Sequence, residues 1–439
     1  MKKIINVLFL TILSIPLIAN DSNKNIMSLN DLLGLIKQSK EIKISEFEKQ
    51  MSIFDYKKTK ALDYGSLNLQ INGLRTDHSG AVFAMKLNER EVKSQDFALE
   101  NLNYPDDRSS FESKLTFSLP LYTGGKISAY KEITKKLMNI AGLDKNNLLI
   151  QKIFEVKKGF YSIVLIEELT AQINTIRKNT LFLRESINQL EIEGFSTKTD
   201  LLMIDSRLSE VDSILSQLKT NKELALHFLS FLTSHPVSDI IHIKDNIYFK
   251  DISDNKILMK NINIKKAEIA IDIKKSQINI SSSDYLPNLG LIAEYGSNDK
   301  KLLGNFSDHD YYMLGFGAKW NLFSGGSSKN DLLKAKVDLL KQKMTLALSK
   351  EGILLQADDI RTKIKNLNFK LEALNKEKKY KKQIFKNFEE SHKERRASMN
   401  DVLIHQSKYI ETLMKIERMK NLKYEEIFKF QTLLDGEKI

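Results

Sequence analysis

The chain has 439 residues, 28% of them charged, and a formal net charge of +12. Its mean hydropathy of −0.31 excludes a bundle of membrane-spanning helices. Lysine and glutamate are spread along the chain, which favours a solvated helix surface over a nucleic-acid site. The absence of cysteine excludes disulfides, thiolate metal sites and a cysteine nucleophile, and we expect no lipidated cysteine.

Residues 1–19 are typical of a secretory signal peptide. Lys2 and Lys3 precede an apolar stretch, and Ala19 is the small residue before the expected cleavage site. A retained membrane anchor is the alternative, but polar residues and Pro16 interrupt the stretch and make it a poor spanning helix. We therefore expect the mature chain to leave the cytoplasm.

Residues 20–63 are expected to form N-terminal periplasmic helices, and 64–122 a β-hairpin with a long external loop. Strict alternation of apolar and polar residues over 67–72 and 115–119 predicts strands with one apolar face. Strands of this pattern are typical of outer-membrane barrels, and a half-buried soluble sheet is the alternative.

Residues 123–234 are predicted to form the first long helical hairpin. Apolar residues from Ile153 to Leu190 fall at spacings of three and four, as in a coiled coil. At about 1.5 Å per residue, a helix of this kind reaches on the order of 100 Å, which suits a conduit across an aqueous compartment. Residues 194–200 are a polar turn, and Asp200 is predicted to N-cap the returning helix.

Residues 235–283 are predicted to form an equatorial belt segment followed by a helix. Residues 284–323 are predicted to form the second β-hairpin, because alternate residues from Tyr312 to Leu322 share an apolar face. Residues 324–439 are predicted to form the second long helical hairpin and the C-terminus.

Two short sequences occur twice at one offset. Leu-Pro-Leu-Tyr-Thr-Gly-Gly at 119–125 returns as Trp-Asn-Leu-Phe-Ser-Gly-Gly at 320–326, and Asp-Leu-Leu at 200–202 returns as Asp-Val-Leu at 401–403. Positions 119 and 320, and positions 200 and 401, are both separated by 201 residues. A shared offset indicates a duplicated unit.

Each copy ends a predicted strand and opens a predicted helix. Glycine adopts backbone angles that other residues avoid, and Thr123 and Ser324 supply hydroxyls for capping. The residues expected to form the two strand-to-helix junctions are Pro120, Gly124, Gly125, Trp320, Gly325 and Gly326.

Four strands cannot close a barrel, and a sheet in lipid can have no open edge. Two chains would supply eight strands, whose interior is filled by side chains, whereas three would supply twelve. We therefore expect an α+β membrane protein with a tandem-repeat protomer. Three copies would form a 12-stranded β-barrel and a long α-helical barrel.

The motif at Pro120–Gly125, its copy at Asn321–Gly326 and the tandem layout resemble the TolC-like outer-membrane efflux proteins. Residues 285–289, residues 194–202 and the loop segment 81–88 are also similar to that family. The resemblance implies a homotrimer in the outer membrane of a Gram-negative bacterium, extending into the periplasm. It also implies docking to a periplasmic adaptor (a membrane fusion protein) and an inner-membrane pump.

In that family the helical tip closes like an iris and is lined by acidic residues. The resemblance implies that Asp200 and Asp401 belong to this periplasmic pore tip. Arg395 and Arg396 stand where the second turn of the family usually has a glycine. A plain helix N-cap is the alternative role for both aspartates, and the two roles can coexist.

We expect a passive outer-membrane exit duct of a tripartite efflux system for drugs, toxic compounds or metal ions. It would contact lipid and need no cofactor or nucleic acid. No metal-ligand spacing, phosphate loop or nucleophile motif is found, so no enzyme is expected. The first alternative is the outlet of a type I protein secretion system. The second, of another class, is a periplasmic coiled-coil adaptor or structural protein.

Overall fold

The computed structural model describes residues 25–241, 247–302, 304 and 307–434. The signal peptide expected over residues 1–19 lies outside these ranges. The chain divides into two compact units. The first unit contains the segment up to Leu35 and residues from Gly159 to Asp245, and the second contains the remainder. Within the described ranges, no helix is long and apolar enough to cross a membrane.

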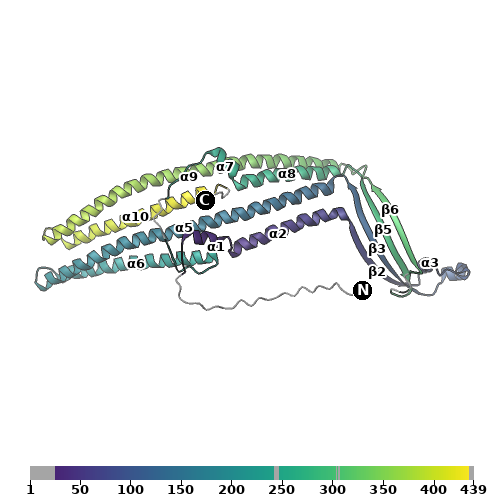
Figure 1. Ribbon diagram of the computed structural model, residues 1–439, viewed down its shortest axis with the longest axis horizontal. Coiled ribbons are helices and arrows are strands. Elements are labelled where there is room, and N and C mark those ends of the chain that lie inside the picture. Colours follow the sequence, from purple (N-terminus) through teal and green to yellow (C-terminus); the bar gives the residue numbers. More distant parts are fainter. Residues whose placement is uncertain (1–24, 242–246, 303, 305–306, 435–439) are drawn as a thin grey trace. The chain divides into compact units, whose positions relative to one another are not determined.

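A four-stranded antiparallel sheet lies in the second unit, with the strand order β2–β3–β5–β6 (Figure 1). The strands are β2 (Ser66–Thr76), β3 (Arg108–Thr123), β5 (Asn288–Asp299) and β6 (Asp310–Lys319). The four predicted strands are therefore present, although the last one ends at Lys319 and not at Leu322. Pairing of β3 with β5 joins the two hairpins, and β2 and β6 form the edges of the sheet.

The register keeps one face of this sheet apolar and the other polar or small. One row of paired residues on the apolar face consists of Leu69, Leu115, Tyr295 and Tyr312. The adjacent row, on the opposite face, consists of Gln70, Lys114, Gly296 and Tyr311. Because successive side chains of a strand point to opposite faces, this contrast extends along all four strands.

The second unit also contains most of the helices. They are α2 (Lys40–Ala61), the first part of α5 (Lys126–Ile192), α7 (Asp254–Lys260), α8 (Ile262–Ser283), α9 (Ser327–Lys393) and α10 (Met399–Gln431). A 3₁₀ turn, η1 (Leu62–Tyr64), leads from α2 into β2. At about 1.5 Å per residue, the 67 residues of α9 span on the order of 100 Å.

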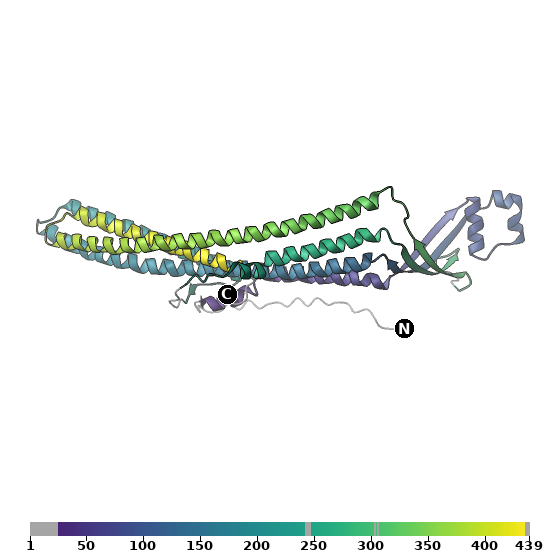
Figure 2. The ribbon, with the colours of Figure 1, turned by 90° about the horizontal axis from the view of Figure 1, so that it is seen from above.

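Four of these helices lie side by side in the order α2–α5–α8–α9 (Figures 1 and 2). Ion pairs connect the neighbours: Lys152 of α5 with Glu41 of α2 at 2.6 Å, Lys136 of α5 with Asp272 of α8 at 3.1 Å, and Lys274 of α8 with Asp338 of α9 at 2.6 Å. Exposed ion pairs contribute about 0–1 kcal/mol each, so they identify neighbours more than they hold them together.

Apolar burial is concentrated where α9 packs against α10. On α9, five apolar residues at spacings of three and four are buried: Ala357, Ile360, Ile364, Leu367 and Leu371. On α10, Val402 and Ile410 are buried in the same way. Burying a side chain of this size contributes about 1.5–3 kcal/mol, so the stripe stabilises this helical hairpin more than its ion pairs do.

The first unit contains a second helical hairpin, formed by the later part of α5 and by α6 (Lys198–Thr233). The predicted stripe of α5 is buried here too, at residues that include Ile163, Ile173, Leu183 and Ile187. The helix α1 (Leu29–Ile36) also begins in this unit, and the short strands β1 (Ile26–Met27) and β4 (Asp239–Ile240) pair in parallel.

Two arginines of α5 bind aspartates of α6 in that unit. The Arg177 Nε lies 2.5 Å from Asp212 Oδ1, and the Arg184 Nε lies 2.5 Å from Asp205 Oδ1. These hydrogen bonds lower the pKa of both carboxyl groups. The pairs are partly exposed and therefore fix the helix register more than they add stability.

The loop between β2 and β3, which is expected to be external, contains short helices that sequence periodicity did not predict: α3 (Ser79–Asn88), η2 (Ser94–Phe97) and α4 (Leu99–Asn103). Its Arg90 guanidinium donates to the carbonyl oxygens of Asp308 and Asp310, at 2.9 and 2.7 Å. The loops of the two β-hairpins are therefore tied together.

The expected belt segment is held against α9 by one side chain. Arg361 of α9 donates to carboxylate oxygens of Asp251, Asp254 and Asp358, each at 2.8 Å. These hydrogen bonds raise the pKa of Arg361, and the bond to Asp251 has the largest effect. Its guanidinium also lies 5.6 Å from the centre of the Phe430 ring, so it connects the belt segment with α10.

Candidate functional site

The two strand-to-helix junctions share one backbone conformation. Gly124 and Gly125 have φ angles of +59° and +85°, and Gly325 and Gly326 have φ angles of +63° and +88°. The helices α5 and α9 begin directly after these pairs. Left-handed backbone of this kind is strained for residues with a Cβ atom, so the repeated Gly-Gly has a direct conformational reason.

A hydroxyl caps each helix in the way that the sequence predicted. The amide of Ile127 donates to Thr123 Oγ1, and the amide of Ser328 donates to Ser324 Oγ, both at 3.3 Å. Each hydroxyl satisfies one of the amides that the first turn of a helix leaves without a partner.

One turn, formed by residues 283–286 between α8 and β5, contacts both junctions. A Cβ atom on Gly124 would lie 2.8 Å from the carbonyl oxygen of Ser283. The indole Nε1 of Trp320 donates to the carbonyl oxygen of Tyr285 at 3.0 Å. The turn therefore fixes where both helices leave the sheet. The sequence contained the Tyr-Leu-Pro signal of this turn, but not its long-range contacts.

Pro120 lies close to the end of β3, as predicted. It pairs with Gly290, and the register shifts between Pro120 and Tyr122. A bulge tolerates a residue without an amide donor, so proline costs little at this position.

The two helical turns far from the sheet also have matching backbones. Each ends its first helix with one residue in the left-handed region: Gly194 with φ +77° and Arg395 with φ +60°. The amides of Phe195 and Gly194 donate to Leu190 and Glu191. The amides of Arg396 and Arg395 donate to Ser391 and His392. These bonds form a Schellman motif in both turns, 201 residues apart.

The returning helices begin with a capping box in both turns. Thr197 is the N-cap of α6, and Asp200 is the third residue of the helix and accepts from the Thr197 amide at 3.0 Å. Ser398 and Asp401 have the same roles in α10, with the corresponding distance 3.3 Å. The prediction that Asp200 is itself the N-cap was therefore wrong, because a hydroxyl residue occupies that position.

Side chains distinguish the two turns. Arg395 takes the backbone position of Gly194, and Arg396 forms an ion pair with Glu394. The first turn exposes Phe195 in place of that charged group. Asp200 lies in the first unit and Asp401 in the second. Their common membership of a pore tip therefore stays a prediction.

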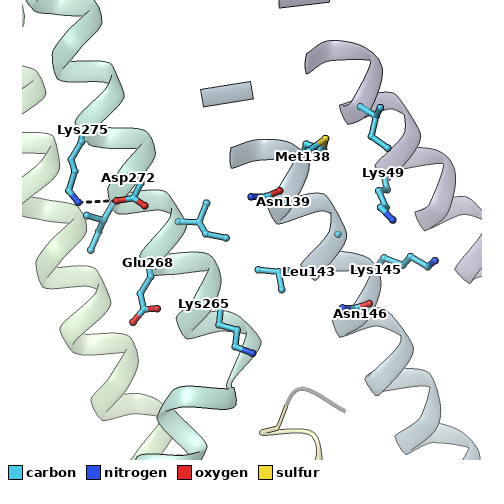
Figure 3. A pocket seen from close by; sticks show the side chains of 14 residues that line it. Lys49, Met138, Asn139, Leu143, Lys145, Asn146, Lys265, Glu268, Asp272 and Lys275 are labelled. Atoms are coloured by element: carbon cyan, nitrogen blue, oxygen red, sulfur yellow. Dashed lines mark hydrogen bonds and ion pairs between the residues drawn. The ribbon is translucent and has the colours of Figure 1, made fainter. Parts of the chain in front are cut away.

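A groove of about 1020 Å³ lies between α2, α5 and α8 in the second unit (Figure 3). Its floor includes Gly142 of α5, and Lys275 and Asp272 form an ion pair on its α8 side at 2.9 Å. Among the described residues, no group of three or more histidine, aspartate or glutamate side chains could hold a metal ion.

Comparisons with known proteins agree on the class. Residues 255–393 match the family model "Outer membrane efflux protein". The alkaline protease secretion protein AprF of Pseudomonas aeruginosa is 20% identical over 235 residues, covering 51% of this chain and 48% of AprF. The chain therefore spans about half the length of this curated relative.

Solved structures of outer-membrane channels share the fold. The match to the crystal structures of CusC covers 96% of this chain and 96% of the CusC chain, with a TM-score of 0.77 and 14% identity. The Campylobacter jejuni CmeC outer membrane channel has a TM-score of 0.75 and 14% identity over 93% of this chain and 85% of its own. The Neisseria gonorrhoeae MtrE outer membrane channel has a TM-score of 0.74 and 14% identity over 95% of this chain and 93% of its own.

The protomer fold is thus that of an outer-membrane channel, with four strands and long helical hairpins. Over residues 255–393 the chain is also similar in sequence to the outer membrane efflux protein family. Of these similar proteins, CmeC and MtrE are described as outer membrane channels and AprF as a secretion protein. The solved structures that share the fold are described as channels, which agrees with the prediction that the chain is not an enzyme.

Proposed function

We propose that this chain is one protomer of a trimeric outer-membrane exit duct. The duct conducts small molecules passively, and a periplasmic adaptor and an inner-membrane pump supply them. The observation that carries this proposal is the four-stranded sheet with one apolar face and two unpaired edges. Such a sheet is stable in lipid only when both edges find partner strands.

The edges are complementary to each other. Three antiparallel pairings separate β2 from β6, so the two edge strands run in opposite directions. The β6 strand of one copy can therefore pair antiparallel with β2 of the next. A head-to-tail contact of this kind generates a closed ring when its rotation closes.

The helices are consistent with the same contact between neighbouring copies, which we call the seam. The outer members of the α2–α5–α8–α9 row each expose an apolar stripe at helical spacing. On α2 the stripe consists of Ile44, Phe47, Met51 and Phe54. On α9 it consists of Val337, Leu340, Met344 and Leu348. Packing of α2 from one copy against α9 of the next would cover both stripes.

Three copies fit a duct better than two. Eight strands enclose an interior that side chains fill, whereas twelve leave room for a channel. The related CusC structures are described as showing transmembrane channel formation, and CmeC and MtrE are described as outer membrane channels.

A cysteine crosslink tests the seam directly, because the chain has no cysteine of its own. Ion pairs place Glu46 of α2 level with Lys145 of α5, and Lys350 of α9 level with Glu268 of α8. Met51 and Met344 are each five or six residues nearer the sheet and are therefore expected at similar heights. We expect the double variant M51C/M344C to give covalent dimers and trimers with a short thiol-reactive crosslinker.

Each single cysteine variant is the control for random collision, and it should give at most covalent dimers. A double variant that stays monomeric on a denaturing gel, while circular dichroism shows the native mixture of helix and sheet, would contradict the trimer. A protein that is soluble without detergent would instead support a periplasmic adaptor or structural protein.

Protein secretion is the second candidate function, and the similarity to the secretion protein AprF favours it. The pore would have the same architecture in both cases, so the partner pump separates them. We expect chemical crosslinking in cells, followed by purification of the tagged duct, to recover an adaptor and a small-molecule pump. Recovery of a protein-exporting transporter would favour secretion.

A further inference from the structure

The polar face of the sheet changes character along its length. At the helix end its residues are mostly small: Ser66, Ser118, Gly290, Gly315 and Gly317. Nearer the external loops two successive rows carry mostly larger side chains: Asn68, Thr116, Glu294 and Met313, then Gln70, Lys114 and Tyr311 beside Gly296. If the apolar face contacts lipid, these rows face the lumen, so the lumen narrows toward the exterior.

The negative charge of one carboxylate on this face, Glu112, is balanced by a neighbouring lysine. Glu112 of β3 lies 3.6 Å from the Lys114 ammonium, and it accepts hydrogen bonds from Asn72 and Tyr311, both at 3.1 Å. The Tyr311 ring reaches it by crossing β5 at Gly296, where a Cβ atom would lie 2.9 Å from the ring. Lys114 and Glu112 therefore add no net charge.

Glu294 of β5 has a different environment. Its Oε1 accepts a hydrogen bond from the Thr116 hydroxyl at 3.4 Å. In the described part of the chain no cation lies within 4.0 Å of its carboxylate. The nearest cation on this face is Lys114, one row away, and its ammonium pairs with Glu112 at 3.6 Å. Toward the helices, the next charge is Lys319, six residues away from Met313 on β6 and therefore about 20 Å distant. That exceeds the Debye length of about 10 Å at 0.1 M salt.

We propose that Glu294 sets a preference for cationic solutes in the barrel of this duct. The inference rests on the proposed trimer: in each copy Glu112, Lys114 and Glu294 together carry one net negative charge, and the three copies place these charges in one ring. Such a ring attracts cations and repels anions at the narrower, exterior half of the lumen. The charge lies on the membrane sheet and is separate from the aspartates of the helical turns.

Planar bilayer recordings under a KCl gradient test this assignment. The substitution Glu294→Gln keeps the size of the side chain and removes its charge. We expect the wild-type duct to prefer K⁺ over Cl⁻, and the variant to lower the permeability ratio about twofold at 0.1 M salt. The difference should shrink at 1 M, where the Debye length is about 3 Å.

Glu100→Gln is the matched control, because it removes one carboxylate from the exposed helix α4 of the external loop. It should leave the permeability ratio unchanged. Equal ratios for E294Q and wild type at 0.1 M would overturn the role of Glu294. A purified wild-type trimer that forms no conducting pore would contradict the proposed duct instead.

Discussion

Arg395 lies in a left-handed backbone conformation, which is unfavourable for a residue with a Cβ atom. Its counterpart in the first repeat is Gly194, which has no Cβ atom. Both Gly194 and Arg395 have positive φ angles and identical places in a Schellman motif. The arginine pays a conformational cost of about 1 kcal/mol at this position.

Substitutions at these two positions should change the local stability of the two turns in opposite directions. We expect Arg395→Gly to slow hydrogen exchange of the amides around the second turn, by about 1 kcal/mol of local opening free energy. Gly194→Ala should accelerate exchange around the first turn, although a Cβ atom there would meet no other atom within 4 Å. Unchanged hydrogen exchange at both turns would show that the positive φ angle does not limit the local stability of the turns.

The capping boxes allow a structural role of Asp401 to be separated from a role in the pore. Ser398→Ala removes the N-cap hydroxyl and keeps the carboxylate, at a cost of about 1 kcal/mol. Asp401→Asn keeps an acceptor and removes the charge. If Asp401 lines the periplasmic tip, only Asp401→Asn should lower cation selectivity in planar bilayers. Equal selectivity of both variants would reduce Asp401 to a capping residue.

At the scale of elements, the junctions differ in how closely the rest of the fold approaches them. Gly124 combines positive φ with a clash for any Cβ atom, whereas a Cβ atom on Gly325 would meet nothing within 4 Å. The first junction is therefore constrained by packing as well as by the backbone, because the turn before β5 lies against it.

This difference gives a matched pair of variants. Both Gly124→Ala and Gly325→Ala should destabilise the protein, each by about 1 kcal/mol from backbone strain. Gly124→Ala should cost a further 1–3 kcal/mol or so, since the Ser283 carbonyl must move. Thermal unfolding, followed by circular dichroism in detergent, measures the stability of both variants. Equal losses of stability would contradict a contribution of packing at Gly124.

The same elements show which features were predictable. The Gly-Gly pairs, the hydroxyl caps and the α5 and α9 stripes depend on neighbours within one or two helical turns, so local sequence predicts them. The N-cap position was missed although the Thr197-x-x-Asp200 capping-box pattern was present. The contact of Trp320 with Tyr285 and the position of Glu294 one row from Lys114 depend on long-range pairing, which periodicity alone does not specify.

At the scale of the whole molecule, the two repeats match in the backbone of their junctions and turns and differ in their loops and surfaces. Junctions and turns recur at the 201-residue offset with the same φ signs and capping patterns. External loops differ in length and helix content, and the two turns differ in charge. Duplication thus explains the architecture, whereas partner choice is expected to depend on the residues that no longer match.

The two unpaired sheet edges also have a consequence for assembly kinetics. Each copy offers two edge strands, β2 and β6, that both present unpaired N–H and C=O groups, so any incomplete ring remains able to bind another chain. Addition of a fourth copy before closure would begin an open polymer. Productive assembly therefore requires the third contact to close intramolecularly, where effective concentration is high, faster than a free protomer arrives. Overproduction should favour aggregation over closed rings.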